Sequence, residues 1–200
     1  MTSLDQMKAF AEALAGHLRA GDLLILSGNL GAGKTTFTQS LGRALGVTGR
    51  ITSPTFVIAR EHPSSGDGPA LVHVDAYRLS DAEELGDLDL DSELEESITV
   101  VEWGAGLAEQ LSSDYLGVTI TPMFDLAADV ADTVYTGEDD SDEDDEADED
   151  ERRLVELHGH GSTWDARLRQ VGDSLRALGG AVEMSELDGS DGSADQEDKQ

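Results

Sequence analysis

Apolar residues recur along the chain with the two periods that distinguish helices from strands. Ahead of Gly21, apolar side chains follow one another at helical spacing, which predicts an amphipathic helix that Gly21 closes. Three largely apolar runs, at residues 23–26, 71–74 and 98–101, predict strands that are covered on both faces. Another run at residues 55–59, after a proline, predicts one further short strand.

The second half of the chain is more polar and predicts fewer buried elements. Apolar and polar residues alternate at 116–121 and 153–157, which predicts two strands with one half-exposed face each. An apolar stripe at helical spacing over residues 164–178 predicts a last helix. The acidic stretch at 81–96 predicts only one short helix, at residues 81–85.

Negative charge is concentrated in two segments. The formal net charge of the 200-residue chain is −30, and 12 of the 14 residues at 138–151 are acidic. Seven more acidic residues lie at 183–200, against Lys199 alone, so that 24 acidic and 12 basic residues remain elsewhere. Like charges without apolar neighbours repel one another and cannot form a core. We therefore expect one domain over residues 1–182, a disordered acidic insert at 137–151 and a disordered acidic tail at 183–200.

Composition argues against several classes of function. Three lysines and a large excess of acid disfavour an independent nucleic-acid surface and binding to an anionic membrane. No apolar run approaches the roughly 20 residues of a membrane span, and the first residues lack the pattern of a secretory signal. Without cysteine the chain has neither a disulfide nor a thiolate metal site. A cytoplasmic protein is expected.

One motif carries recognisable chemistry. Residues 28–35 read Gly-Asn-Leu-Gly-Ala-Gly-Lys-Thr and match G-x-x-x-x-G-K-[ST], the phosphate-binding loop (P-loop) of nucleotide hydrolases. In such a loop the backbone amides and the helix N-terminus face the phosphates, Lys34 reaches the β- and γ-phosphates, and the Thr35 hydroxyl binds Mg²⁺. The predicted nucleotide-binding residues are Asn29, Leu30, Gly31, Ala32, Gly33, Lys34, Thr35 and Thr36.

The motif follows the expected strand at 23–26, and after it Phe37, Leu41, Ala44 and Leu45 recur at helical spacing, which predicts a helix that ends at Gly46. A P-loop requires this order of strand, loop and helix, and the order predicts the fold class. We expect an α/β protein with a single P-loop NTPase-like domain. Its central, mainly parallel sheet is flanked by helices, and the two alternating strands form an antiparallel pair at the C-terminal end.

Two acidic residues are candidates for the metal and for the attacking water. Asp75 and Glu102 each follow an apolar run, so both are expected at the sheet edge that faces the nucleotide. One of them would bind the metal and the other would face the water or the γ-phosphate; the sequence leaves open which is which. Trp103 directly follows Glu102 and is expected beside the site.

Two other groups of side chains have alternative interpretations. The hydroxyls of Thr52, Ser53 and Thr55 surround Pro54 and either sense the γ-phosphate, as a switch does, or belong to an ordinary turn. His73 lies inside an apolar run and is expected to be a hydrogen-bonded interior histidine rather than a metal ligand.

Several separated motifs together resemble one family, the TsaE (YjeE) ATPases. The P-loop is followed in order by Ser-Pro-Thr-Phe at residues 53–56, His-Val-Asp-Ala-Tyr-Arg-Leu at 73–79, Glu-Glu-Leu at 83–85 and Val-Glu-Trp at 101–103. The resemblance covers about residues 1–123 and resumes near 152–168.

The resemblance implies a Mg²⁺-dependent ATPase that works with TsaB and TsaD in making threonylcarbamoyladenosine beside the anticodon of tRNA, with tRNA contacted only through the complex. Carried over residue by residue, it implies Lys34 and Thr35 in the phosphate loop, Thr35 and Glu102 as Mg²⁺ ligands, Asp75 as an acid for turnover, and Trp103 as a required neighbour. Thr55 completes the expected catalytic set, and Arg153 is a possible nucleotide contact. Asn29, Ala76 and Gly104 depart from the family pattern without removing a phosphate or metal ligand.

Two other functions fit parts of the same pattern. A P-loop small-molecule kinase needs an arginine-bearing lid, whereas Arg60 and Arg78 are isolated in the sequence. An acidic interaction protein would bind nucleotide without turning it over. Phosphate release, a phosphorylated acceptor, or binding alone distinguishes the three.

Overall fold

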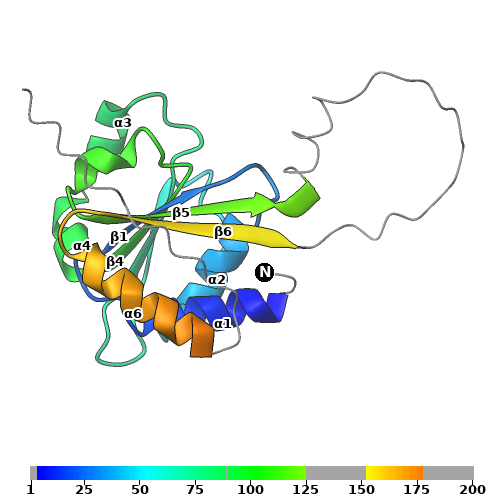
Figure 1. Cartoon of the computed structure of the whole chain (residues 1–200). Coiled ribbons are helices and arrows are strands. Elements are labelled where there is room, and N and C mark those ends of the chain that lie inside the picture. Colours follow the sequence, from blue (N-terminus) through cyan, green and yellow to red (C-terminus); the bar gives the residue numbers. More distant parts are fainter. Residues whose placement is uncertain (1–3, 89, 125–151, 178–200) are drawn as a thin grey trace, which may run out of the picture.

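Six strands form one sheet that organises the molecule (Figure 1). The computed structural model describes residues 4–88, 90–124 and 152–177. The strands are β1 (Leu23–Ser27), β2 (Ala59–His62), β3 (Leu71–Asp75), β4 (Ile98–Glu102), β5 (Tyr115–Pro122) and β6 (Arg153–His160). Their order across the sheet is β2-β3-β4-β1-β5-β6. The four central strands run parallel, and β2 and β6 pair antiparallel with their neighbours at the two edges.

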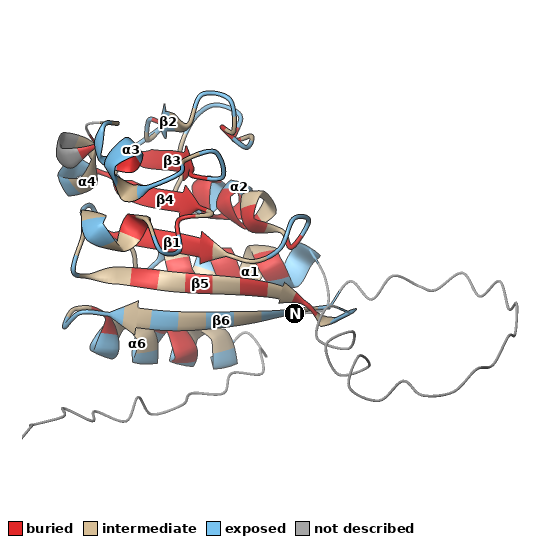
Figure 2. Ribbon diagram, turned by 90° about the horizontal axis from the view of Figure 1, so that it is seen from above, coloured by how far each residue is buried: buried red, intermediate tan, exposed pale blue. Residues whose placement is uncertain are grey.

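Helices cover both faces of the sheet, which confirms the expected α/β fold. They are α1 (Leu4–Ala15), α2 (Lys34–Ala44), α3 (Ala82–Gly86), α4 (Asp91–Glu96), the 3-10 helix η1 (Ala108–Leu111) and α6 (Trp164–Ala177). On one face α1, α2 and α6 enclose the larger apolar core, and on the other α3 and η1 help to enclose a smaller one. The strands β1, β3 and β4 are therefore buried on both sides, as their largely apolar runs predict, whereas every second residue of β5 is only half-buried (Figure 2).

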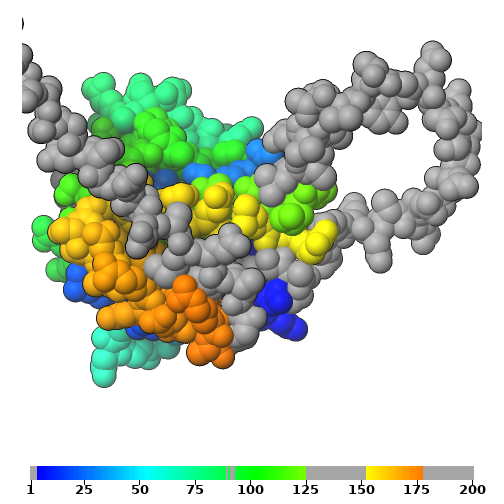
Figure 3. Space-filling view, viewed as in Figure 1, coloured from blue at the N-terminus to red at the C-terminus, as the bar shows by residue number. Residues whose placement is uncertain are grey.

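The last helix is fixed to the start of the sheet by one arginine. Arg167 donates to the Asp22 carboxylate and, at 2.6 Å, to the carbonyl of His17, and its guanidinium lies over the Trp164 ring. The Arg167–Asp22 pair is largely buried, so its hydrogen bonds must offset the loss of hydration. α6 also packs against β6, and the two lie together on one side of the molecule (Figure 3).

Most predicted elements are present, and two predicted elements need correction. The first helix ends at Ala15 rather than continuing to Gly21. The strand expected at residues 55–59 is wrong, because the amides of Val57 and Ile58 both donate to the carbonyl of Pro54, at 2.8 and 2.7 Å, and form a turn. The strand β2 starts only at Ala59.

The acidic stretch before β4 contains more helix than its sequence pattern indicates. The predicted short helix is confirmed as α3, whose N-terminus is capped by the Asp81 carboxylate through the amides of Glu83 and Glu84. The sequence pattern does not predict α4, because Leu94 is its single apolar residue and cannot form a stripe. The acidic insert and the acidic tail lie outside the described residues.

Candidate nucleotide and metal site

The P-loop connects β1 to α2 in the expected order, and its first glycine is required by close packing. Gly28 has φ 137° and passes so close to β5 that a Cβ atom here would lie 2.2 Å from the carbonyl oxygen of Ile120. Gly33, at φ 110°, is the N-cap of α2. These left-handed conformations favour glycine and let the loop curl at the helix N-terminus, where anions bind.

Gly28→Ala is expected to destabilise the protein, because the added methyl group meets backbone that cannot move aside cheaply. A cost of about 2–3 kcal/mol from the clash and the unfavourable φ would lower Tm by at least about 5 °C. Thermal unfolding followed by circular dichroism measures it. Gly66→Ala is the matched control, since a Cβ atom there meets open space and the backbone is ordinary. Equal Tm values for the two variants would contradict the close packing of the loop on β5.

Lys34 is held at the centre of the site. Its ammonium group donates to the carbonyls of Gly28 at 2.7 Å and Asn29 at 3.0 Å, and it lies 3.5 Å from the centroid of the Trp103 ring. The residue is only 5% exposed. Burial lowers the pKa of Lys34 below its usual value, and the charges of Glu102 and Asp75 partly offset that shift. A buried cation that the P-loop itself positions is suited to bind a polyphosphate.

Glu102 lies next to Thr35 at the ends of β4 and α2. The Thr35 hydroxyl donates to Oε2 of Glu102 at 2.9 Å, and the carboxylate is almost fully buried. His73 approaches the other oxygen, with Nε2 2.7 Å from Oε1, and the Thr38 hydroxyl lies 3.5 Å from the same atom. A hydroxyl and a carboxylate at the end of a P-loop form the oxygen donor set that Mg²⁺ prefers.

Asp75 lies one strand further from the P-loop and binds the turn around Pro54. Its Oδ2 accepts hydrogen bonds from Ser53 Oγ at 2.7 Å and Thr55 Oγ1 at 2.5 Å, and its Oδ1 accepts from the amide of Tyr77 at 3.1 Å. The strand register places Asp75 directly opposite Glu102. The two acids therefore have different neighbours: Glu102 is paired with the P-loop threonine, and Asp75 with the hydroxyl-bearing turn.

Aromatic rings border the same site. Trp103, at φ 61°, stacks at a tilt on Tyr77 with ring centroids 5.1 Å apart. A non-glycine residue in this conformation is uncommon and occurs often at functional sites. Nearby in the sequence, the Arg78 guanidinium lies 4.5 Å from the Phe56 ring centroid.

The structure thus brings the predicted site residues together, and it also places Arg153 on the loop. Arg153 Nε, from β6, donates to the carbonyl of Ala32 at 3.1 Å. The tip of the loop is exposed at Asn29, Leu30 and Gly31, and Leu30 is 90% exposed.

The sequence predicts that His73 is buried but does not predict its contact with the site. It is an interior histidine as expected, but its partner is the candidate metal ligand Glu102. The alternation of a strand already contains the signal, since residues 73 and 75 point to the same face and Asp75 is a site residue.

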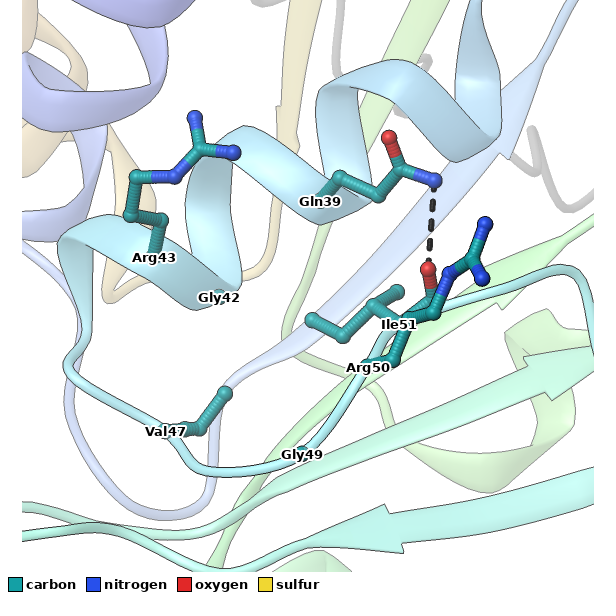
Figure 4. A pocket seen from close by; sticks show the side chains of 7 residues that line it. All are labelled: Gln39, Gly42, Arg43, Val47, Gly49, Arg50 and Ile51. Atoms are coloured by element: carbon teal, nitrogen blue, oxygen red, sulfur yellow. Dashed lines mark hydrogen bonds between the residues drawn. The ribbon is translucent and has the colours of Figure 1, made fainter.

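A hollow lies beside the C-terminal half of α2, away from Lys34. It has a volume of about 380 Å³ and is lined by Gln39, Gly42, Arg43, Val47, Gly49, Arg50 and Ile51 (Figure 4). Gln39 Nε2 donates to the carbonyl of Ile51 at 3.1 Å and closes one side of it. Because α2 separates this hollow from the P-loop, it is not part of the nucleotide site.

Comparison with known proteins identifies the family. A family model described as "Threonylcarbamoyl adenosine biosynthesis protein TsaE" matches residues 1–126. The chain belongs to the TsaE family. The matched part of the chain includes the P-loop, Asp75, Glu102 and Trp103, whereas β6 with Arg153 lies beyond it.

Individual TsaE relatives agree with this assignment. The chain is 57% identical over 133 residues to the tRNA threonylcarbamoyladenosine biosynthesis protein TsaE of Streptomyces coelicolor, covering 66% of this chain and 90% of that protein. It is 52% identical over 114 residues to the protein of the same name from Mycobacterium tuberculosis, covering 54% and 68%. The solved structure of YdiB from Bacillus subtilis is similar with a TM-score of 0.60 at 26% identity, covering 86% of this chain and 91% of that one.

None of the helices that the structure describes has both the length and the apolar character needed to cross a bilayer.

Proposed function

We propose that this TsaE-family protein is a Mg²⁺-dependent ATPase that acts with TsaB and TsaD in the formation of threonylcarbamoyladenosine in tRNA, in the cytoplasm. The observation that carries the proposal is the Thr35–Glu102 pair, 2.9 Å apart, beside the buried ammonium group of Lys34. The names of the relatives supply the pathway.

The donor set fits a Mg²⁺ ion that is shared with a triphosphate. Thr35 and Glu102 would hold the ion, and the phosphates and water would fill its remaining positions, which is how Mg²⁺ is usually bound at such sites. When bound, the ion neutralises charge on the transferred phosphoryl group. Lys34 would bind the β- and γ-phosphate oxygens through its ammonium hydrogens.

Asp75 is proposed to act on the water that attacks the γ-phosphate. It holds Ser53 and Thr55 through their hydroxyls, and it is not in contact with the P-loop threonine. A carboxylate in this position would orient the attacking water, and the Ser53 and Thr55 hydroxyls would respond to the γ-phosphate. Trp103 covers Lys34 and would have to adjust when phosphate binds, because two carbonyls and the ring face already surround the ammonium group.

An exposed apolar surface around this site supports the role of protein partners. We call it the apolar rim; it consists of Leu30 (90% exposed), Phe56 (87%), Val57 (60%) and Tyr77 (64%). Leu30 belongs to the P-loop, Phe56 and Val57 follow Thr55, and Tyr77 stacks on Trp103. Large apolar side chains gathered around a charged site are typical of a protein interface rather than of a free surface.

Phosphate release by the purified chain tests the proposal. We expect slow Mg²⁺-dependent hydrolysis of ATP that rises when TsaB and TsaD are added together. Transfer of phosphate to a small acceptor would instead identify a kinase. ATP binding without turnover, with partners present, would identify a nucleotide-dependent interaction protein.

Phe56→Ser is expected to weaken the partner effect without changing ATP affinity. Loss of one large aromatic contact at an interface costs about 2 kcal/mol or more, so half-maximal stimulation should need at least about tenfold more TsaB and TsaD. Stimulated hydrolysis measured against partner concentration tests this. Leu4→Ser changes an exposed apolar residue outside the rim, so TsaB and TsaD should stimulate its ATP hydrolysis as they do that of the parent protein. Equal stimulation of the parent, Phe56→Ser and Leu4→Ser proteins would contradict the proposal that the apolar rim contacts the partners.

A further inference from the structure

His73 holds the side of Glu102 that faces away from Thr35. Its Nε2 lies 2.7 Å from Oε1, and both side chains are almost fully buried, at 0% and 3% exposure. A carboxylate accepts hydrogen bonds and has none to donate, so the imidazole hydrogen must be on Nε2. The Thr38 hydroxyl lies farther from Oε1, at 3.5 Å, and also donates to the carbonyl of Lys34 at 3.0 Å.

The other ring nitrogen of His73 shows that burying this imidazole costs folding free energy. Nδ1 is buried and has no hydrogen-bond partner among the described residues. Leaving a buried polar atom unpaired opposes folding, and an apolar side chain in this strand would avoid the penalty. The imidazole therefore serves its Nε2 contact with Glu102 rather than the packing of β3.

The two oxygens of Glu102 would respond differently to a metal ion. Oε2 accepts from Thr35, and that hydrogen bond must change when the hydroxyl oxygen turns to the ion. The hydrogen bond from His73 to Oε1 does not compete with the ion and can persist throughout. It would then be the contact that keeps the carboxylate in the same rotamer with and without metal.

We propose that His73 is a positioning residue that orients Glu102 for the divalent ion bound with the nucleotide. The inference rests on the proposed Mg²⁺-dependent ATPase function. Partners that hydrogen-bond a metal-ligating carboxylate typically contribute 10- to 100-fold to metal affinity. His73 would therefore affect the metal far more than the nucleotide, which the P-loop binds independently.

Two binding measurements on the full chain test the proposal. The first is the affinity for Mn²⁺ at saturating ADP, followed by electron paramagnetic resonance. The second is the affinity for ADP in EDTA, measured by calorimetry. For His73→Leu we expect Mn²⁺ affinity to fall by about tenfold or more while metal-free ADP affinity stays unchanged. His73→Gln, which keeps a donor at the end of the side chain, should recover most of the loss.

Thr99→Val is the matched control. Its hydroxyl is also buried in the sheet without a partner among the described residues, but Thr99 does not contact Glu102. This variant should leave both affinities unchanged. In a Glu102→Gln background His73→Leu should cause no further loss of Mn²⁺ affinity, because the two residues would act through the same carboxylate.

The possible failures are distinct. Parent-like Mn²⁺ affinity in His73→Leu, or an equal loss of Mn²⁺ and ADP affinity with no recovery in His73→Gln, would overturn the positioning role. If the parent protein itself binds no Mn²⁺ with ADP, the proposed Mg²⁺-dependent function fails first.

Discussion

A Lys34→Ala variant is expected to lose ATP affinity by at least about a hundredfold. A hydrogen bond to a charged group contributes about 1.5–3 kcal/mol, and Lys34 is positioned to make two of them to the β- and γ-phosphates. No other described lysine can replace it, since Lys8 lies on α1 and pairs with Asp5. The loss should therefore appear as an absence of measurable binding rather than as a modest shift.

Calorimetric titration with Mg-ATP measures the effect, and Lys8→Ala is the control. Lys8 is half-buried on α1 and pairs with Asp5, so its removal changes net charge by the same amount without touching the site. Alanine at position 34 leaves the carbonyls of Gly28 and Asn29 without their donor, and circular dichroism should be used to verify that α2 still forms. Unchanged affinity in a folded Lys34→Ala protein would contradict the assignment of the P-loop.

The sequence predicts the centre of the fold well because buried parallel strands have a pattern that few other elements share. The runs at β1, β3 and β4 are largely apolar and are bounded by loops, and the structure confirms all three as strands. The P-loop adds a fixed order of strand, loop and helix. Together these signals predict the α/β class and the parallel sheet before any contact is known.

The edges of the molecule are harder to predict because local hydrogen bonds there compete with the strand pattern. Residues 55–58 are apolar and β-branched enough to predict a strand, but the carbonyl of Pro54 accepts two of their amides and closes a turn. Ile58, at φ 69°, reverses the chain before β2 begins. No residue pattern marks that reversal, since isoleucine rarely adopts this conformation.

In the candidate site, too, the residues of one contiguous motif are predictable from sequence, whereas contacts between distant segments are not. The motif predicts Lys34 and Thr35 because the whole P-loop is contiguous. It cannot choose between Asp75 and Glu102, because that choice depends on the order of the strands. In the structure β4 is the direct neighbour of β1, so Glu102 reaches Thr35, and β3 lies one position further away.

Glu102→Gln is expected to slow ATP hydrolysis by two to three orders of magnitude while most ATP binding is retained. Glutamine keeps the shape of the side chain and can still accept the hydrogen bond from Thr35, but it brings no negative charge to a metal ion. Losing such a ligand is expected to cost about 3–4 kcal/mol of transition-state stabilisation. ATP affinity should fall by less than about tenfold, because the P-loop amides and Lys34 remain.

The measurement is the rate of phosphate release across a Mg²⁺ titration, with TsaB and TsaD present at saturation. The half-saturating Mg²⁺ concentration should rise and the maximal rate should fall in Glu102→Gln. Glu109→Gln is the control, since that carboxylate is on η1 and accepts a hydrogen bond from the amide of Gly106, outside the site.

Asp75→Asn should also reduce the maximal rate, but with little change in the Mg²⁺ requirement, because Asp75 contacts the turn at Ser53 and Thr55 rather than the P-loop threonine. If instead Asp75→Asn shifts the Mg²⁺ requirement and Glu102→Gln does not, the metal belongs to β3, and the contact between Thr35 and Glu102 only stabilises the loop.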